Sequence, residues 1–191
     1  VRLAASAAEV RRAQKLRWRG FYEEMRAIAD APSKLARRDI DPFDAICDHL
    51  VVIDHSVMEK PAFGMPRPAI VGTYRLLRQE VADRHGGFYT TGEFAIDGLL
   101  SRHRGLRFLE LGRSCVLPPY RNKRTVELLW HGIWTYVLSH RIDVMFGCAS
   151  LEGTDPKALS LELSFLHHHA RAPAEWSAGP VPARHVEMGR L

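Results

Sequence analysis

Long apolar segments are missing from this chain of 191 residues. No run approaches the roughly 18 uncharged residues that a membrane-spanning helix needs, so no such helix is expected. The opening residues VRLAASAAEV also lack the apolar segment and the cleavage site of a secretory signal. Because the first residue is valine and not methionine, we expect the natural N-terminus to lie further upstream.

Cysteine is scarce and shows no pattern. Cys47, Cys115 and Cys148 form an odd set without the spacing of a metal site, which favours reduced thiols in the cytosol. Cys115 and Cys148 fall within apolar predicted strands, and we interpret them as core thiols and not as nucleophiles. Adjacent histidines at 167–169 project in different directions from a helix, so the sequence predicts no metal site there.

Internal repeats and low-complexity segments are absent as well. Lysine and arginine (27 residues) outnumber aspartate and glutamate (22 residues), which gives a net charge of +5. Such a balance suits an anionic partner, namely nucleic acid, an acidic protein or an anionic lipid surface, but it is also an ordinary solubility charge. One alternative function is therefore a non-catalytic basic module that binds nucleic acid. Against it, the basic residues are scattered and no nucleic-acid-binding motif is present.

The first predicted element is a helix. Ser6 and Glu9 match a capping box, which predicts a helix over residues 7–29. Arg17 interrupts its apolar face. A cation in this position either extends outward along its methylene groups or meets an anion in a cleft, and the residues alone favour the first interpretation.

The remaining elements alternate in type. The sequence predicts strands at 49–54, 69–77, 106–117 and 143–151, a short strand or loop at 88–94, and helices at 125–140 and up to 169. The buried face of the helix at 125–140 is expected to contain Val126, Leu129, Trp130, Ile133 and Val137. Consecutive strands followed by strand–helix–strand predict an α+β fold, a mixed sheet flanked by helices. We expect one domain over residues 1–170 and a proline-rich segment over 171–191.

Seven phrases between residues 14 and 156 resemble one family. They are QKLRWRGFYEEM, DIDPFDAICDHLVV, IVGTYRLLR, GGFYTTGEF, LELGRSCVLPPYR, ELLWHGI and FGCASLEGTDP. In this order they resemble the bacterial L-ornithine Nα-acyltransferases of ornithine-lipid biosynthesis, which belong to the GNAT superfamily. The resemblance implies a GNAT-like fold and transfer of a fatty acyl group, typically 3-hydroxylated, from acyl carrier protein to the α-amine of L-ornithine, giving lyso-ornithine lipid.

The resemblance also implies partners and location. The donor is 4′-phosphopantetheine on acyl carrier protein, so no bound cofactor is expected, and neither is nucleic acid. The enzyme would be cytoplasmic and make peripheral contact with the inner face of the inner membrane, which receives the product. The family continues with further strands, so the C-terminal portion of this chain is expected to be shortened.

A more distant resemblance links the chain to the acyl-homoserine-lactone synthases, whose activity is the alternative within the enzymes. The shared patterns are R-x-x-x-F, D-x-x-D, V-G-x-x-R and E-x-x-R. They fall on Arg17, Phe21, Asp41, Asp44, Arg75, Glu110 and Arg113. The resemblance implies substrate binding by the first four of these residues and a catalytic role for the last three.

Glu110 is the candidate general base. The α-amine has a pKa near ~7.7–8.0 and must lose a proton before it attacks a thioester, which a carboxylate can accept directly or through a water. Burial in an apolar strand would raise the proton affinity of Glu110. Alternatively, Glu110 forms a structural ion pair with Arg113 or Arg75. A bulge at Gly112 would bring Glu110 and Arg113 to the same side of the strand.

Ornithine carries a second ammonium group and a carboxylate. We expect Asp41 or Asp44 to meet an ammonium group and an arginine to meet the carboxylate, with Arg17 and Phe21 closing the pocket. The alternative is that the two aspartates are solvated or cap a turn at Pro42.

The turn before the helix at 125–140 lacks glycine. GNAT proteins usually carry a phosphate loop of the form Q/R-x-x-G-x-G/A, in which backbone N–H groups approach the phosphates. Here Arg121, Lys123 and Arg124 occupy the turn. These cations suit the single phosphate and the acidic surface of acyl carrier protein. The alternative is an ordinary exposed first turn, although cations there oppose the helix dipole.

Overall fold

The computed structural model describes residues 1–60 and 64–191. A five-stranded sheet has the order β1 (Arg2–Leu3), β2 (Asp48–Glu59), β3 (Arg67–Arg78), β4 (Phe108–Val116) and β5 (Val144–Phe146). The first four strands are antiparallel and β5 is parallel to β4, which confirms the predicted mixed sheet. Part of the expected connection between β2 and β3, residues 61–63, lies outside the described residues.

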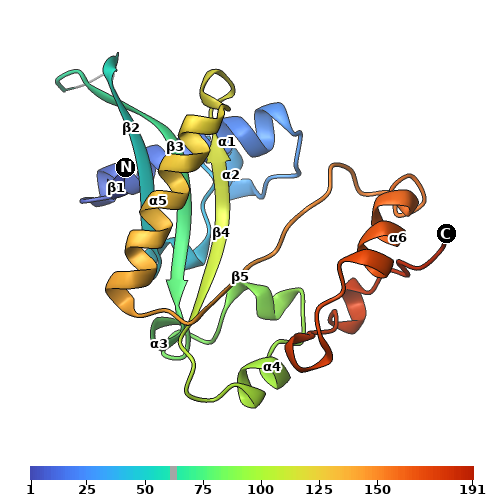
Figure 1. Ribbon diagram of the computed structural model, residues 1–191. Coiled ribbons are helices and arrows are strands. Elements are labelled where there is room, and N and C mark those ends of the chain that lie inside the picture. Colours follow the sequence, from blue (N-terminus) through green and yellow to red (C-terminus); the bar gives the residue numbers. More distant parts are fainter. Residues whose placement is uncertain (61–63) are drawn as a thin grey trace.

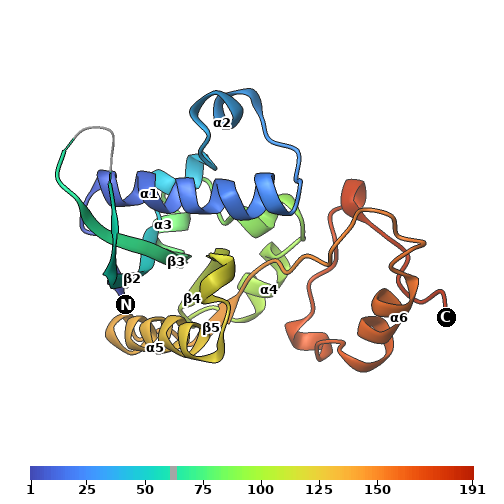
Figure 2. The same ribbon diagram turned by 90° about the horizontal axis from the view of Figure 1, so that it is seen from above.

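Helices cover both faces of this sheet. They are α1 (Ala7–Trp18), α2 (Ala31–Ala36), α3 (Gln79–Ala82), α4 (Asp97–Arg102), α5 (Lys123–His140) and α6 (Ser160–His169). A π-helix, η1 (Arg19–Glu24), follows α1, and the 3-10 helices are η2 (Pro42–Ala45), η3 (Tyr89–Gly92), η4 (Pro118–Tyr120), η5 (Ala174–Trp176) and η6 (Pro182–Arg184). Figure 2 shows α1 on one face of the sheet and α5 on the other. The α+β fold class is confirmed.

Helix α1 begins where the sequence predicts. Ser6 is the N-cap, and its side chain accepts a hydrogen bond from the Glu9 N–H at 3.3 Å. The α-helix ends at Trp18, however, and continues as the π-helix η1, so the predicted end at residue 29 is wrong. Gly20 lies in this segment so close to β4 that an added Cβ would be 2.4 Å from the Cys115 Sγ.

Helix α5 packs on the sheet with a narrower face than predicted. Asn122 caps it by accepting the Thr125 N–H at 3.1 Å. Leu129, Ile133 and Val137 are buried as expected, but Val126 and Trp130 are about half exposed, so that part of the prediction is wrong. Trp130 lines a groove together with Met145 and Phe146 of β5, which contains three residues.

Strand β5 is short and is not buried along its length, in contrast to the predicted strand at 143–151. The chain leaves the sheet after Phe146 and reaches α6 at Ser160, and this helix ends at His169 as predicted. Figure 1 shows α6 beside the sheet and not packed on it. The segment 171–191 returns to the body of the domain through an isolated bridge between Phe94 and Pro180 and through His103, which stacks on Trp176.

The core is divided by the sheet. One buried cluster includes Leu76, Leu109 and Ile133 beneath α5, and another includes Leu16 and Val51 beneath α1. In the described part of the chain, no helix has both the length and the apolar character needed to cross a bilayer.

Candidate active site

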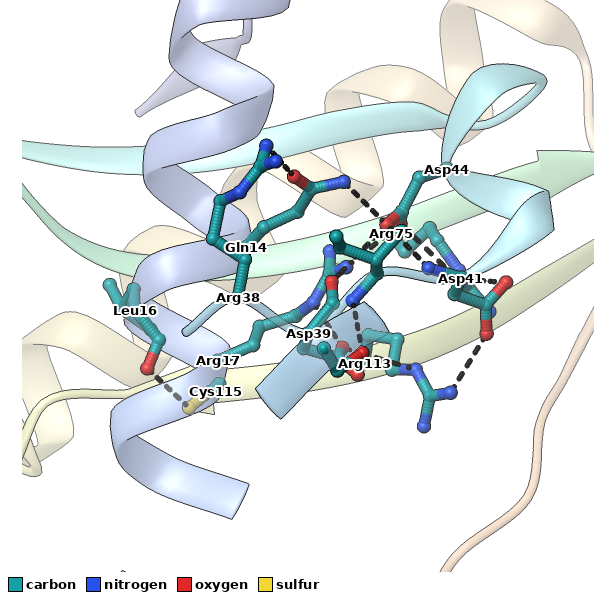
Figure 3. A network of polar contacts seen from close by, with 12 residues as sticks. Gln14, Leu16, Arg17, Arg38, Asp39, Asp41, Asp44, Arg75, Arg113 and Cys115 are labelled. Atoms are coloured by element: carbon teal, nitrogen blue, oxygen red, sulfur yellow. Dashed lines mark hydrogen bonds and ion pairs between the residues drawn. The ribbon is translucent and has the colours of Figure 1, made fainter. Parts of the chain in front are cut away.

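A cluster of three arginines and three aspartates lies beneath α1 (Figure 3). Arg17 is 0% exposed. Its Nε donates to Asp39 Oδ2 at 2.6 Å, and its Nη2 donates to the two carboxylate oxygens of Asp44 at 2.8 and 2.7 Å. The interpretation that this side chain extends outward is therefore wrong, and Arg17 meets anions inside the fold.

Asp41 and Asp44 lie at the short helix η2, the first just before it and the second within it, and both are buried. Asp41 is its N-cap and accepts the Phe43 N–H at 2.8 Å, while Asp44 accepts the Asp41 N–H at 3.3 Å. The predicted turn-capping role at Pro42 is confirmed. Because the same carboxylates also bind arginines, they are not solvated.

Arg75 and Arg113 complete the cluster from β3 and β4. Arg75 Nη1 lies 3.0 Å from Asp41 Oδ1, and Arg113 Nη2 donates to Asp41 Oδ2 at 2.8 Å. Burial acts to raise the pKa of Asp41, but the Arg75 guanidinium, the Phe43 N–H and Arg113 outweigh it, and the pKa is lowered. Burial opposes the charge on Arg113, yet Asp39 and Asp41 raise its pKa.

A β-bulge positions Arg113. Thr73 pairs with Cys115 and Arg75 pairs with Gly112, so one residue of β3 faces two residues of β4. Arg113 occupies the bulge with a φ of 51°, a left-handed conformation that costs a non-glycine residue free energy. The expected bulge is confirmed, one position after Gly112.

Glu110 is buried, but it bonds to neither arginine. Its Oε2 accepts the Tyr89 N–H at 3.0 Å, and its Oε1 accepts the Thr90 N–H at 2.7 Å and the Thr90 hydroxyl at 2.5 Å. The alternative of an ion pair with Arg113 or Arg75 is therefore wrong. A carboxylate has about four lone-pair sites, so one site remains for a further proton donor.

Tyr89 connects the two parts of the site. Its backbone binds Glu110, while its ring centroid lies 5.3 Å from the Arg113 guanidinium carbon and 5.8 Å from that of Arg75. Glu110 and Arg113 thus both contact Tyr89 on one side of β4, as the bulge was expected to allow. Burial raises the pKa of the Tyr89 phenol.

A groove opens where β4 and β5 separate. It has a volume of about 310 Å³ and is lined by Tyr74, Leu111, Trp130, Met145, Phe146, Gly147, Cys148 and Ala149. Pairing between the two strands ends at Glu110 and Phe146. An added Cβ at Gly147 would be 2.2 Å from the Leu111 carbonyl oxygen, so glycine is needed where the chain leaves the sheet. Leu111 faces α5, opposite to Glu110, and the groove reaches the surroundings of Glu110 through Cys148, whose Sγ lies 3.5 Å from the Thr90 hydroxyl that binds Glu110.

The cationic turn lies at the start of α5. Arg121 is bound to Glu24, with Nη2 2.6 Å from Oε2, and donates to the Val116 carbonyl oxygen. Lys123 has an exposed side chain that lies 3.6 Å from Glu127. Arg124 is exposed and has no ion pair among the described residues. Lys123 and Arg124 are thus available to a partner, whereas Arg121 already uses part of its guanidinium on Glu24.

Several residues of the site were not singled out from the sequence. Asp39 and Thr90 bind Arg17 and Glu110, and Gln14 Nε2 donates to Asp44 Oδ2 at 2.9 Å. Asp39 precedes Asp41 by two residues, and this spacing was the signal in the sequence that could have added Asp39 to the predicted site. Phe21, which was expected to close the pocket, packs against the apolar cluster beneath α1.

The cysteines have different surroundings. Cys115 is buried as predicted, and burial raises its pKa to about 11. Cys148 lines the groove beside the Thr90 hydroxyl, so its assignment to the core is wrong, and burial raises its pKa too. Within residues 1–60 and 64–191, no group of three or more histidine, cysteine, aspartate or glutamate side chains could hold a metal ion.

Comparison with known proteins assigns the family. Residues 16–131 match the family model described as "Acetyltransferase (GNAT) domain". The chain belongs to this family. The matched residues run from the end of α1 through β2, β3 and β4, which include Arg75, Glu110 and Arg113, to the first half of α5.

This GNAT chain also resembles curated proteins named L-ornithine N(alpha)-acyltransferase. It is 58% identical to the one from Rhizobium meliloti (strain 1021) and 52% identical to the one from Agrobacterium fabrum, each over 98% of this chain and 62% of the relative. The chain therefore spans less than two thirds of the length of these relatives. Among solved structures, FeeM, an N-acyl amino acid synthase from uncultured soil microbes, has a TM-score of 0.48 at 16% identity, covering 86% of this chain and 75% of that one.

Proposed function

We propose that this chain carries the acyltransferase site of an L-ornithine Nα-acyltransferase. It moves a fatty acyl group, typically 3-hydroxylated, from acyl carrier protein to the α-amine of L-ornithine, and the product is lyso-ornithine lipid. The observation that carries the proposal is the 58% identity to a relative of that name over 98% of this chain. The wider proposal places the enzyme in the cytoplasm, in peripheral contact with the inner membrane.

The donor proposal combines the groove with the cationic turn. The groove beside β5 is apolar in most of its lining and suits the pantetheine arm and the acyl chain. Lys123 and Arg124 at the start of α5 suit the pantetheine phosphate and the acidic surface of the carrier protein. No separate cofactor is needed, because the donor brings its own phosphopantetheine.

The chemistry proposed for Glu110 is proton removal. The α-amine of ornithine gives a proton to the free lone pair of Glu110, directly or through one water, and its nitrogen then attacks the thioester carbonyl carbon. The new C–N bond forms as the C–S bond breaks, and the second proton that the nitrogen loses is taken up by the released thiolate, which leaves as the thiol. The bonds from Tyr89 and Thr90 hold the carboxylate in one orientation during this step.

The contacts of ornithine are proposed from the side-chain groups of the site that have no partner of their own among the described residues. Arg113 is partly exposed and uses part of its guanidinium on Asp41, so its other N–H groups can bind the ornithine carboxylate. Asp41 and Asp44 are already bound to arginines. We therefore assign the two aspartates to positioning Arg75 and Arg113, in place of the direct ammonium contact expected from the sequence.

A substrate-choice assay tests the activity. The purified chain is incubated with 3-hydroxyacyl carrier protein and either ornithine or S-adenosylmethionine, and mass spectrometry identifies the acylated amine. The full-length Rhizobium meliloti relative serves as a control, because it is longer than this chain. Acylated ornithine supports the proposal, whereas formation of a lactone would reject it in favour of acyl-homoserine-lactone synthesis.

A pair of variants tests Glu110. Glu110→Gln should lower turnover by about 10²–10⁴ while carrier-protein binding is kept, because the base is lost. Thr90→Val removes one hydroxyl donor to Glu110 and should cost far less. Equal and small losses in the two variants would mean that Glu110 anchors the segment of η3 and does not act as the base.

A further inference from the structure

An exposed surface with apolar and basic side chains lies on the segment that joins α1 to α2, away from the groove. Figure 2 shows this segment and α2 on the side of the sheet opposite to α5. We call it the α1–α2 surface and define it by three apolar and three basic residues: Met25, Ile28, Leu35, Arg19, Arg26 and Lys34.

The apolar members are unusually exposed. Ile28 is 96% exposed, Leu35 is 90% exposed and Met25 is 58% exposed. Isolated apolar side chains are common on protein surfaces, but three of this size with such exposure in one short segment indicate a contact surface.

The charge of the surface is positive. Two of the neighbouring acids are paired, Glu23 with Arg37 and Glu24 with Arg121, while Asp30 caps α2 and keeps its charge. Arg19, Arg26 and Lys34 are exposed and form no ion pair with any residue that the structure describes. Three cations against one unpaired carboxylate leave this segment, which also carries the exposed aliphatic side chains, with a net positive charge.

The surface has a defined shape. The Asp30 side chain accepts the Ser33 N–H at 2.8 Å, and the buried Ser33 hydroxyl accepts the Ile40 N–H at 3.2 Å. Arg37 closes α2 in a left-handed conformation. These bonds hold Lys34 and Leu35 on a preformed turn, so little ordering is needed when a partner binds.

We propose that the α1–α2 surface docks the protein on an anionic lipid surface. Ile28, Leu35 and Met25 enter the boundary between headgroups and acyl chains, and the three cations bind anionic headgroups. Aliphatic side chains give a nucleic acid no hydrogen bond or stacking contact, whereas a lipid surface accommodates the aliphatic and the basic groups together. This proposal rests on the proposed function, and it names the surface through which the enzyme would make its peripheral contact with the membrane.

Vesicle co-sedimentation tests the surface without any substrate, so that its failure is distinguishable from failure of the acyl transfer. The chain should bind vesicles of phosphatidylglycerol and phosphatidylcholine, bind vesicles of phosphatidylcholine alone more weakly, and dissociate as salt is added. Arg26→Glu combined with Lys34→Glu should weaken binding at least about fivefold per cation. Ile28→Ser combined with Leu35→Ser should weaken it about tenfold.

Matched controls come from α6 and its flanks. Lys157→Glu with Arg171→Glu changes the net charge equally, and Leu161→Ser with Phe165→Ser removes two exposed apolar side chains elsewhere. Both controls should bind like the unmodified chain. Equal losses in the controls, no binding of the unmodified chain to anionic vesicles, or a loss confined to binding of acyl carrier protein would each overturn the proposal.

Discussion

The ion-pair cluster beneath α1 and the cationic turn before α5 contain similar charged groups in opposite surroundings. In the cluster, Arg17 is enclosed and bound to Asp39 and Asp44 at distances below 3 Å. In the turn, Lys123 has a side chain that is 90% exposed and lies 3.6 Å from its acidic neighbour. Buried charges must be matched by partners in the same fold, whereas exposed charges remain available for a partner from outside.

The largest effect should come from breaking the buried half of this comparison. Arg17→Met leaves Asp39 and Asp44 without their main partner, and the free energy of unfolding should fall by about 3–5 kcal/mol. Arg124→Met, at an exposed position, should change it by less than about 0.5 kcal/mol. Urea unfolding midpoints at equal slope measure both changes.

A rescue variant sharpens the same test. Arg17→Met combined with Asp39→Asn and Asp44→Asn removes the charges on both sides, so part of the lost stability should return. If the single and triple variants are equally destabilised, packing of the arginine stem and not charge pairing explains the loss.

The cluster also shows where sequence reasoning succeeded and where it failed. Arg17 was recognised as an unusual member of an apolar helix face, but its partners lie 22 and 27 residues further along the chain, one in a loop and one in η2. No periodicity reports such a contact, and so the outward orientation was favoured. The bulge near Gly112 was predictable because a glycine inside a strand is a local signal, whereas the left-handed Arg113 that occupies it was not.

The edge of the sheet teaches the same lesson. The apolar run from residue 143 predicts a buried strand, and the strand pairing is correct for Val144–Phe146. After Phe146 the chain leaves the sheet, and Gly147 at this point lies so close to the Leu111 carbonyl oxygen that no side chain would fit. Where the two strands separate depends on contacts between them, and the sequence of one strand alone does not report such contacts. The groove and the exposure of Trp130 follow from this divergence.

Acid should affect the cluster by a moderate amount. The pKa of Asp41 in the folded chain lies below its ordinary value of 3.8, so the unfolded chain binds protons more readily. The stability that Asp41 contributes is fully present above its unfolded pKa and is lost as the pH falls through its lowered folded pKa. Unfolding free energies from about pH 6 to about pH 3 should therefore decline less steeply for Asp41→Asn than for the unmodified chain. Parallel curves would contradict the lowered pKa.

The smallest effect on stability should come from the exposed half of the comparison. Lys123 and Arg124 lie in the first turn of α5, where cations oppose the helix dipole. Lys123→Glu with Arg124→Glu should leave the free energy of unfolding unchanged or raise it by about 0.3–1 kcal/mol. Binding of acyl carrier protein should nevertheless weaken, most at low salt where charges are least screened.

Surface plasmon resonance measures the binding, and Lys157→Glu with Arg171→Glu is the control of equal charge change. Unchanged carrier-protein binding would make the turn ordinary surface, whereas a loss of binding without loss of stability would show that these cations are retained for a partner and at some cost to their own helix.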